Sequence, residues 1–520
     1  MTDRGKRIGV LCMLIGVVLA SLTEAVTGSV LSIARLDMMS DVHASPDEFA
    51  FLDFGYTAAK LVGFAAGAWL ASSRHLRRAL TLSTVVMTLA CAIAAFSRDL
   101  TVLSLARVIQ GGAGGILLVC GQTLLLTSFQ RRSQPFIQVI FAIGAVVAPA
   151  TLAPYLHGWM LDNHSWETVF LSVLPIGATA SALLIMSDTE TTDQKPLTTP
   201  DMRGFLFLTL AAFCVSFVLS QGNRWDWHRD ETIATCIALG AAAFLAFVLS
   251  AGRTQPRRAQ LLNFDVFQDP GFTFGFLASF AAGFALMGSG FLIPSFAISM
   301  LRMTPTAAGM LLLPSTVMFV STLILAAILI SRLRLPPVVT VPFGILGLIS
   351  SMLMLSGSTG GSGMPDMLPA VLLRGASLGL LFLSITLITL LDLNRAVVAS
   401  GVALFNIGRL FGGLVGVSFL QTFIENETAQ NRAVLAAHIT PGSVEVLERV
   451  VSAAKYLTMN GMEAGAAMKA STLLMGKQVV HQSMLIAFNS AFFAVAAFFL
   501  FAAPALIISK IVITKISASR

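Results

Sequence analysis

Apolar residues in this chain are gathered into long runs, which short polar connections separate. A helix needs roughly 20 apolar residues to cross the hydrocarbon core of a bilayer, and most of these runs reach that length. They lack the alternation of apolar and polar positions that strands of a membrane barrel show. We therefore predict an all-α polytopic membrane protein with 14 transmembrane helices, at residues 8–33, 51–71, 79–96, 102–126, 136–159, 168–187, 204–221, 232–251, 272–297, 306–330, 337–356, 366–391, 397–422 and 482–509.

The composition agrees with a membrane protein. The 520 residues are 56% hydrophobic and only 11% charged, whereas a soluble domain is about a quarter charged. The formal net charge of +7 raises the question of nucleic-acid binding. The basic residues form short clusters between apolar runs and no continuous face, so we expect no nucleic-acid partner. The cysteines lie in apolar runs without metal-ligand spacing and are interpreted as packing residues, at Cys12, Cys91, Cys120, Cys214 and Cys236.

Basic residues are frequent in every second connection, which predicts the orientation. With a cytoplasmic N-terminus, the even number of spans places both termini inside, in agreement with the positive-inside rule. The predicted inside segments contain Arg4, Lys6, Arg7, Arg74, Arg77, Arg78, Arg131, Arg132, Lys195, Arg203, Arg253, Arg257, Arg258, Arg332, Arg334, Arg395, Lys510, Lys515 and Arg520. The short outside segments contain only Arg35, Arg98, Arg224, Arg229 and Arg302. We expect a multi-pass protein of the cell (inner) membrane with N- and C-termini in the cytoplasm.

Two arginines at similar depth indicate that the chain contains two related halves. Arg107 lies in the fourth run, within LARVIQGGAGG, and Arg374 lies in the twelfth, within LLRGASLG. An N-terminal and a C-terminal six-helix bundle would each contain one of them, in its fourth helix. Such repetition is typical of transporters whose site lies between the halves. The predicted parts are the N-terminal bundle 1–187, a cytoplasmic linker 188–203, two inserted helices 204–251, a cytoplasmic loop 252–271, and the C-terminal bundle 272–520 with a long outside loop 423–481.

Several segments, spread over most of the chain, match motifs of a known family. They include RVIQGGAGGILL (107–118), APYLHGWMLDNHSWETVF (153–170), FLIPSFAISMLRMTPTAAGMLLLP (291–314) and ASGVALFNIGRLFGGLVGV (399–417). These segments resemble helix four, the end of helix five, helices nine to ten and helix thirteen of the fourteen-helix, EmrB/QacA-type drug:proton antiporters. That family belongs to the major facilitator superfamily. The resemblance implies the major facilitator fold, alternating access by rocking of two bundles, and export driven by proton entry.

The chain departs from that family's pattern at three places. Ser72 stands in the loop after helix two, where the family commonly has an acid. In helix five, Ala153 and His157 stand where glycines are usual. In helix one, Thr23 takes the place of an aspartate, and Glu24 follows it. The resemblance is therefore to a divergent member, and a drug substrate does not follow from it.

Charged residues within the predicted spans are candidates for proton coupling. Glu24 and Lys60 lie roughly 13–15 Å below the outer ends of their helices, and Arg107 lies roughly 8–10 Å below its own. Helices joined by a short loop are usually neighbours, so Glu24 can meet Lys60, Arg107 or both. Burial disfavours a charged carboxylate and a nearby cation favours it, so rocking would tie protonation to conformation. We predict proton-coupling roles for Glu24, Arg107 and Asp53. A permanent ion pair is the alternative, and Asp53 either joins this group or reaches water.

Five residues are predicted to line a substrate cavity, namely Tyr56, Lys60, Gln110, Arg374 and Arg409. Lys60 either binds an anionic substrate group or only neutralises a neighbouring acid. Arg374 and Arg409 have no acid within the predicted spans. Carbonyls, helix ends or snorkelling can satisfy them, or they attract an anionic substrate. Packing is the alternative role of Tyr56 and Gln110. The excess of cations favours an amphipathic, weakly acidic substrate over a purely cationic one.

Enzyme chemistry has no support in the sequence, so we predict no catalytic residues and no metal site. HExxH, P-loop and GxSxG motifs are absent, and the histidines are dispersed, mostly at predicted membrane surfaces or in loops. A channel is also disfavoured. We expect a proton-coupled exporter of small amphipathic molecules, drugs or metabolites, with no cofactor beyond the proton gradient. Proton-coupled uptake of a small, anionic metabolite is the alternative.

The long connection 423–481 is the candidate site for a protein partner. Its segment SVEVLERVVSAAKYL predicts an amphipathic helix with Ser443 as the N-cap. The connection either folds as a cap over the outer mouth or forms a docking surface. A membrane-fusion adaptor protein, which some relatives in the resembling family use, is the candidate partner, besides the small-molecule substrate, protons and the lipid bilayer.

Overall fold

The computed structural model describes residues 3–72, 75–187, 200–252, 261–439 and 443–518. Within these residues, 14 helices are long and apolar enough to cross a membrane. The described part of the chain contains helices and no strand. The sequence-based prediction of an all-α polytopic membrane protein with 14 spans is therefore confirmed.

The first six spans form one half of the molecule. Their helices are α1 (Asp3–Ser29), α3 (Pro46–Ala71), α4 (Leu76–Phe96), α5 (Leu100–Ser128), a composite fifth span, and α8 (Glu167–Met186), with the short α2 (Leu31–Asp41) after α1. The fifth span joins η1 (Arg131–Ser133), α6 (Gln134–Ala142), the π-helix η2 (Ile143–Leu152) and α7 (Ala153–Asn163). Pro149 lies inside η2. Because proline cannot donate a backbone hydrogen bond, it favours the wider π-helical winding at this point.

The last six spans form the other half. They are α11 (Pro270–Ser299), α12 (Pro305–Ser331), α13 (Thr340–Leu355), α14 (Met364–Leu390), α15 (Val398–Ala437) and α17 (Ala464–Ala518). Their packing repeats that of the first half. The pairs α3–α5, α4–α5, α1–η2, α1–α8 and α4–α8 recur as α12–α14, α13–α14, α11–α15, α11–α17 and α13–α17. The two halves thus share one topology, which the paired arginines first indicated.

Two further spans, α9 (Met202–Gln221) and α10 (Glu231–Gly252), are inserted between the halves in sequence. Helix α9 packs on α3, and α10 packs on α9. Rings of α3 and α9 meet edge to face, with Phe54 and Phe213 at 5.4 Å and Phe54 and Phe217 at 5.3 Å between centroids. The inserted pair therefore lies mainly against the first half, and α9 also contacts α15 of the second half. The predicted linker 188–203 lies largely outside the described residues.

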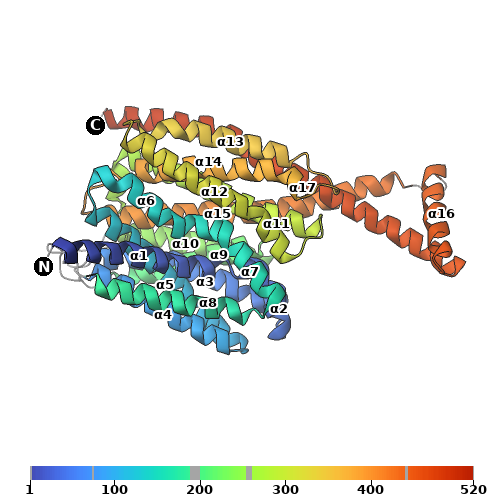
Figure 1. The fold of residues 1–520 in the computed structure, drawn as a ribbon, viewed down its shortest axis with the longest axis horizontal. Coiled ribbons are helices and arrows are strands. Elements are labelled where there is room, and N and C mark those ends of the chain that lie inside the picture. The colour runs from blue at the N-terminus through green and yellow to red at the C-terminus, as the bar shows by residue number, and fades with distance from the viewer. Residues whose placement is uncertain (1–2, 73–74, 188–199, 253–260, 440–442, 519–520) are drawn as a thin grey trace.

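Both termini lie at one end of the bundle, here called the terminal side, and a helical arm projects from the opposite end, the arm side (Figure 1). The arm consists of the end of α15, the short α16 (Val444–Met459) and the beginning of α17. It extends away from the bundle, so the alternative of a folded cap over the mouth is wrong. Helix α15 continues to Ala437 because residues 423–437 contain neither glycine nor proline to end it.

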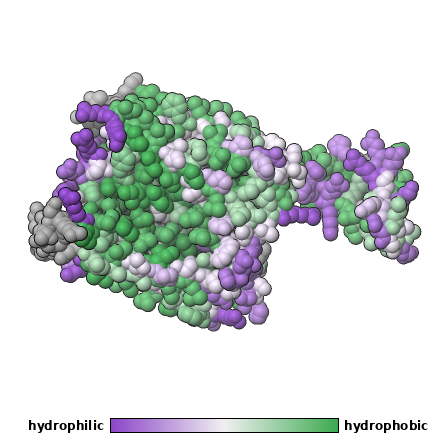
Figure 2. Space-filling model, viewed as in Figure 1, coloured by the Kyte–Doolittle hydropathy of each residue, from purple (hydrophilic) through white to green (hydrophobic). Residues whose placement is uncertain are grey.

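Apolar side chains cover the flank of the bundle, as a lipid-facing surface requires. Figure 2 shows a broad hydrophobic band across the visible face of the bundle, with hydrophilic residues at both ends and along the arm. Exposed members of this surface include Leu82, Leu105, Phe244, Val317 and Phe343. Exposure of these side chains to water would be unfavourable, whereas in a bilayer they contact lipid tails that are equally apolar.

The two halves contact each other towards both sides of the membrane. On the arm side, the Asp162 carboxylate of α7 accepts a hydrogen bond from the backbone N–H of Thr306 in α12, at 3.1 Å, and another from its hydroxyl group. On the terminal side, Arg131 pairs with Asp392 at 2.5 Å across the halves. The halves are thus in contact at both ends.

Candidate functional site

A buried ion pair joins the first two spans. The Glu24 carboxylate of α1 accepts hydrogen bonds from the Lys60 ammonium group and, at 3.0 Å, from the Tyr56 hydroxyl, both of α3. The Glu24 and Lys60 side chains are only 5% and 12% exposed. One helical turn separates Tyr56 from Lys60, so both side chains leave α3 on the same face. This pair places a titratable carboxylate inside the first half.

Arg107 of α5 binds α1 and α3 directly and is linked to α4 through Gln110. Its guanidinium group donates to the carbonyl of Thr27 in α1 at 2.9 Å and to the carbonyl of Leu52 in α3 at 3.3 Å. It also donates to Gln110 at 3.0 Å, and Gln110 donates in turn to a carbonyl of α4. The guanidinium carbon lies 4.1 Å from the centre of the Tyr56 ring, a cation–π contact. Arg107 therefore reaches Glu24 indirectly, through Tyr56.

The glycine-rich part of α5 brings its backbone against α3 at these residues. A Cβ atom on Gly111 would overlap the carbonyl oxygen of Tyr56, and one on Gly115 would lie 2.5 Å from the carbonyl oxygen of Lys60. Both positions need glycine because any side chain would force the helices apart. The QGGAGG motif thus positions the Glu24 partners.

Among the described residues Asp53 forms no hydrogen bond with Glu24, Lys60 or Arg107, although its charge acts on Arg107. Its carboxylate pairs with Arg35 at 3.5 Å, and the two side chains are 46% and 44% exposed. It lies two turns towards the arm side from Lys60 on the same helix. Of the alternatives that the sequence left open, the structure places Asp53 at the water-facing end of α3.

Arg374 takes the place in the second half that Arg107 takes in the first. It is fully buried, and it donates to the Ser289 hydroxyl at 2.7 Å and to the Leu286 carbonyl at 3.4 Å, both in α11. Arg107 and Arg374 each tie the fourth span of a half to its first span. These bonds fit the alternative in which neutral protein groups bind Arg374, although its Nη1 atom has no hydrogen-bond partner among the described residues. Arg374 does not line the cavity described below.

Arg409 of α15 faces the interface between the halves. Its guanidinium group donates to Asn406 at 2.6 Å and lies 5.8 and 5.9 Å from the ring centres of Phe405 and Phe382. Among the described residues no carboxylate forms a salt bridge with it. It lines a cavity of about 10 Å³, which has room for about one water molecule. The other lining residues are Gln122, Gln138, Phe141, Ala142, Val146, Phe382, Leu383 and Thr386.

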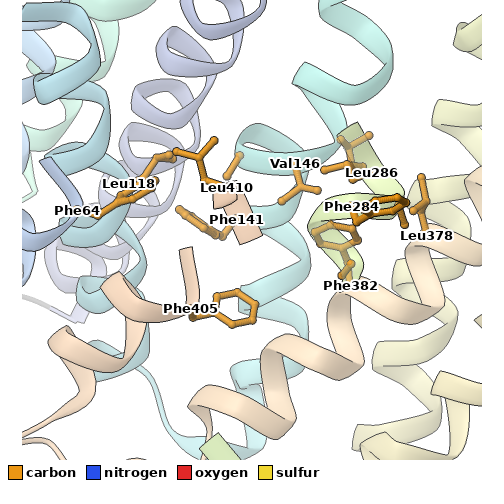
Figure 3. Packing of buried hydrophobic residues seen from close by; sticks show 14 of the residues in the cluster. Phe64, Leu118, Phe141, Val146, Phe284, Leu286, Leu378, Phe382, Phe405 and Leu410 are labelled. Carbon is orange, nitrogen blue, oxygen red and sulfur yellow. The ribbon is translucent and has the colours of Figure 1, made fainter. Parts of the chain in front are cut away.

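Amide side chains connect the halves at this cavity. Asn406 of α15 donates to Gln122 of α5 at 3.1 Å, and Gln122 donates to Gln138 of α6 at 3.2 Å. Gln138 donates to Gln134 at 3.3 Å. Figure 3 shows the apolar surroundings, where Phe141 and Val146 of the fifth span lie near Phe382 and Phe405. Polar and aromatic side chains both line this small cavity.

The four amide residues and His157 are not among the predicted site residues. Gln122 and Gln138 are polar positions within apolar runs, Gln134 stands just before the fifth run, and Asn406 stands three residues before Arg409, so these signals are present in the sequence. His157 lies within the predicted fifth span, near its outer end. It is fully buried in α7. The predicted cavity residues Tyr56, Lys60 and Gln110 instead lie in the cluster around Glu24.

Two structurally repeated helix bundles that meet at a small cavity are the architecture of many secondary transporters. The sequence profile of the Major Facilitator Superfamily matches residues 13–417. The chain belongs to that superfamily, as a divergent EmrB-type member, and it is a multi-pass membrane transporter.

Two relatives and one solved structure are similar to this chain over most of its length. It is 24% identical over 490 residues to the multidrug export protein EmrB of Haemophilus influenzae, covering 93% of this chain and 92% of the relative. It is 25% identical over 429 residues to the fatty acid resistance protein FarB of Neisseria gonorrhoeae, covering 82% and 81%. A bacterial homologue of the human lysosomal transporter Spinster, in an inward-facing, unoccupied conformation, has the same fold, with 14% identity, a TM-score of 0.56 and coverage of 99% of both chains.

Proposed function

We propose that this transporter is a proton-coupled antiporter that exports small amphipathic molecules by alternating access. The observation that carries the proposal is the buried Glu24–Lys60 pair with Tyr56. The buried Glu24 carboxylate can exchange a proton only when water reaches it. Its negative charge is balanced by the Lys60 ammonium group, which stands at the end of a flexible side chain. The names of the relatives, a multidrug export protein and a fatty acid resistance protein, support export of amphipathic molecules.

Rocking of the halves links that pair to transport. The terminal-side contact Arg131–Asp392 and the arm-side contact Asp162–Thr306 tie the halves together at opposite ends. Alternating access requires that one of these contacts opens while the other stays closed. Arg107 binds carbonyls of α1 and α3, so a relative shift of these helices changes the surroundings of Glu24.

The test is transport by Glu24→Gln in proteoliposomes with an imposed pH gradient. We expect the variant to lose gradient-driven export while it retains exchange of substrate between the two sides. Asp53→Asn is the matched control, because it removes an exposed acid from the neighbouring helix, and it should keep gradient-driven export. Wild-type coupling in Glu24→Gln would exclude Glu24 as the coupling group.

Uptake of a small anionic molecule is the second candidate function, and Arg409 favours it. This guanidinium group lines the cavity, and no carboxylate of the described residues forms a salt bridge with it. An anion bound there would be repelled by charged Glu24, so anion and proton would bind together rather than compete. Such coupling drives both in the same direction. Inward proton movement with outward substrate supports antiport, and proton and anion moving together support uptake.

We place the protein in the inner membrane, with the terminal side in the cytoplasm and the arm outside. The arm offers exposed apolar residues to a partner, among them Val434, Leu447, Val451, Leu473 and Leu474. A membrane-fusion adaptor is the proposed partner, since an exported molecule needs a conduit beyond the membrane. Crosslinking from Leu447 or Leu473 in intact cells tests this docking, and adducts confined to lipid would argue against it.

A further inference from the structure

Arg409 differs from Arg107 and Arg374 in what its guanidinium group binds. Each of the other two donates hydrogen bonds to a neighbouring helix and so ties two helices of one half together. Among the described residues, Arg409 makes one hydrogen bond, to Asn406, which stands three residues earlier in the same helix. A guanidinium group has five N–H donors. Most donors of Arg409 therefore have no acceptor within the described part of the chain, and its hydrogen bonding links no second helix.

Both halves of the molecule line the cavity at this guanidinium group. The first half contributes residues of α5, α6 and η2, and the second half contributes residues of α14 and α15. Gln122 and Gln138 of the first half each donate one hydrogen bond from an amide group that has two N–H donors. Aromatic rings of α6 and α14 complete the lining. A cation, amide donors and apolar rings thus meet at one point between the halves.

A chain of amide side chains leads away from the Arg409 charge. Asn406 donates to Gln122, Gln122 to Gln138, and Gln138 to Gln134. The last amide donates to backbone carbonyls at the end of α5. Each amide presents its oxygen to the member nearer the guanidinium group, and this alignment of dipoles partly stabilises the positive charge. A carboxylate would stabilise it more, because charge-assisted hydrogen bonds are stronger than neutral ones.

The protein itself supplies no such carboxylate in the described structure. The charge of Glu24 acts on Arg409 without a hydrogen bond between them, and the Glu24 carboxylate is bound by Lys60 and Tyr56. The cavity has room for about one water molecule. A carboxylate group is larger, so it can enter only when the halves that line the cavity move apart, as they do in alternating access.

We propose that Arg409 binds the acid group of an amphipathic organic anion, with Gln122 and Gln138 of the opposite half as further donors. The apolar body of the anion packs against the aromatic rings of the cavity, among them Phe141 and Phe382. This inference rests on the proposed function and names its substrate class, and it holds for export and for uptake. Since both halves contribute donors, neither half alone forms the complete site.

Equilibrium binding of radiolabelled phenylbutyrate to the purified transporter in nanodiscs tests the proposal without a proton gradient. At about pH 7 this carboxylic acid is ionised. Phenylbutyramide is the neutral competitor, because its amide group has nearly the size and shape of the carboxylate. We expect the wild type to bind the acid about tenfold or more tightly than the amide, as a hydrogen bond to a charged group predicts. Empty nanodiscs correct for partition of both compounds into lipid.

Two substitutions decide whether Arg409 causes this preference. Arg409→Gln should abolish it, so that acid and amide bind alike. Arg302→Gln is the matched control, because it removes the same charge from an exposed position of the same half, and it should keep the preference. A wild type without a preference for the acid has no anion site. A preference that survives in Arg409→Gln belongs to another cation. Either result overturns the proposal.

A second measurement locates the ligand without a change at Arg409, and it decides the question if Arg409→Gln does not fold. In a variant without the native cysteines, Ala142→Cys places a thiol on the cavity wall and Val451→Cys places one on the exposed face of α16. Phenylbutyrate should slow alkylation at position 142 more than phenylbutyramide does, and neither should affect position 451. Equal rates at position 142 with both compounds would overturn the proposal.

These measurements are independent of proton coupling. Wild-type coupling in Glu24→Gln would refute the role of Glu24 and leave an acid preference at Arg409 intact. Absence of acid binding would refute the anion site and leave the coupling test unaffected.

Discussion

The Glu24–Lys60 pair makes a quantitative prediction about stability. Lys60→Met would leave the Glu24 carboxylate in a nearly closed site with only the Tyr56 hydroxyl as a partner. Removing one member of a buried ion pair typically costs about 3–5 kcal/mol, because the remaining charge has no counterion. Glu24→Gln leaves the Lys60 ammonium group in the same situation, with a similar expected cost.

The double variant separates a true pair from two independent residues. If Glu24 and Lys60 acted independently, Glu24→Gln/Lys60→Met would cost the sum of both single effects, about 6–10 kcal/mol. Because neither member of the pair remains as an unpaired charge in the double variant, we expect it to be no less stable than either single variant. The coupling free energy should therefore be about 3 kcal/mol or more.

Unfolding by denaturant in detergent micelles, followed by tryptophan fluorescence, measures these free energies. The exposed Arg35–Asp53 pair is the matched control, since it joins neighbouring segments of the same half. A cycle on this control pair should give about 0–1 kcal/mol, the usual range for pairs in water. Single effects at Glu24 and Lys60 that add within about 0.5 kcal/mol would refute the argument.

Two further predictions concern the contact between α3 and α5 and the N-terminal cap of α5. Gly111→Ala should destabilise the first half by about 1–3 kcal/mol, because the new Cβ would overlap the Tyr56 carbonyl oxygen, whereas the nearest atom to a Cβ on Gly112 lies at 3.9 Å. Gly112→Ala should be neutral by the same unfolding measurement, and equal losses in both variants would exclude the contact as the cause. Asp99 caps α5 with its carboxylate, and two backbone N–H groups of the first turn lower the pKa of this acid. The cap therefore stabilises the charged form at neutral pH, and its contribution is lost as the pH falls through the lowered pKa. Asp99→Asn should remove that acid-dependent part of the melting temperature, which a pH series of melting curves would show.

Hydrophobic patterning was sufficient to predict the helices, because a span needs only length and apolar composition. The runs around Arg107 and Arg374 were placed in equivalent helices of two halves, and the recurring helix pairs agree with that. Helix ends were less accurate. Helices α15 and α17 extend far beyond the predicted limits, since a helix outside the membrane needs no apolar run and its polar turns resemble a loop in sequence.

The sequence likewise predicted some features of the candidate site and not others. Glu24, Lys60 and Arg107 stand out in sequence because a charge in an apolar span needs a partner. Which partner each takes was not predictable, because Arg107 and Glu24 meet through Tyr56 and the approach of α5 to α3. Arg107 and Arg374 bond neutral groups, which no pattern of charges reveals.

The sequence by itself determined that this protein is a membrane transporter of repeated helical halves with ionisable residues inside. Only the tertiary structure decided that Asp53 faces water, that Arg409 lines the cavity, and that His157 is buried. The physical reason is that hydropathy and charge act residue by residue along the chain. Burial, pairing and closure depend on distances between helices that are far apart in sequence.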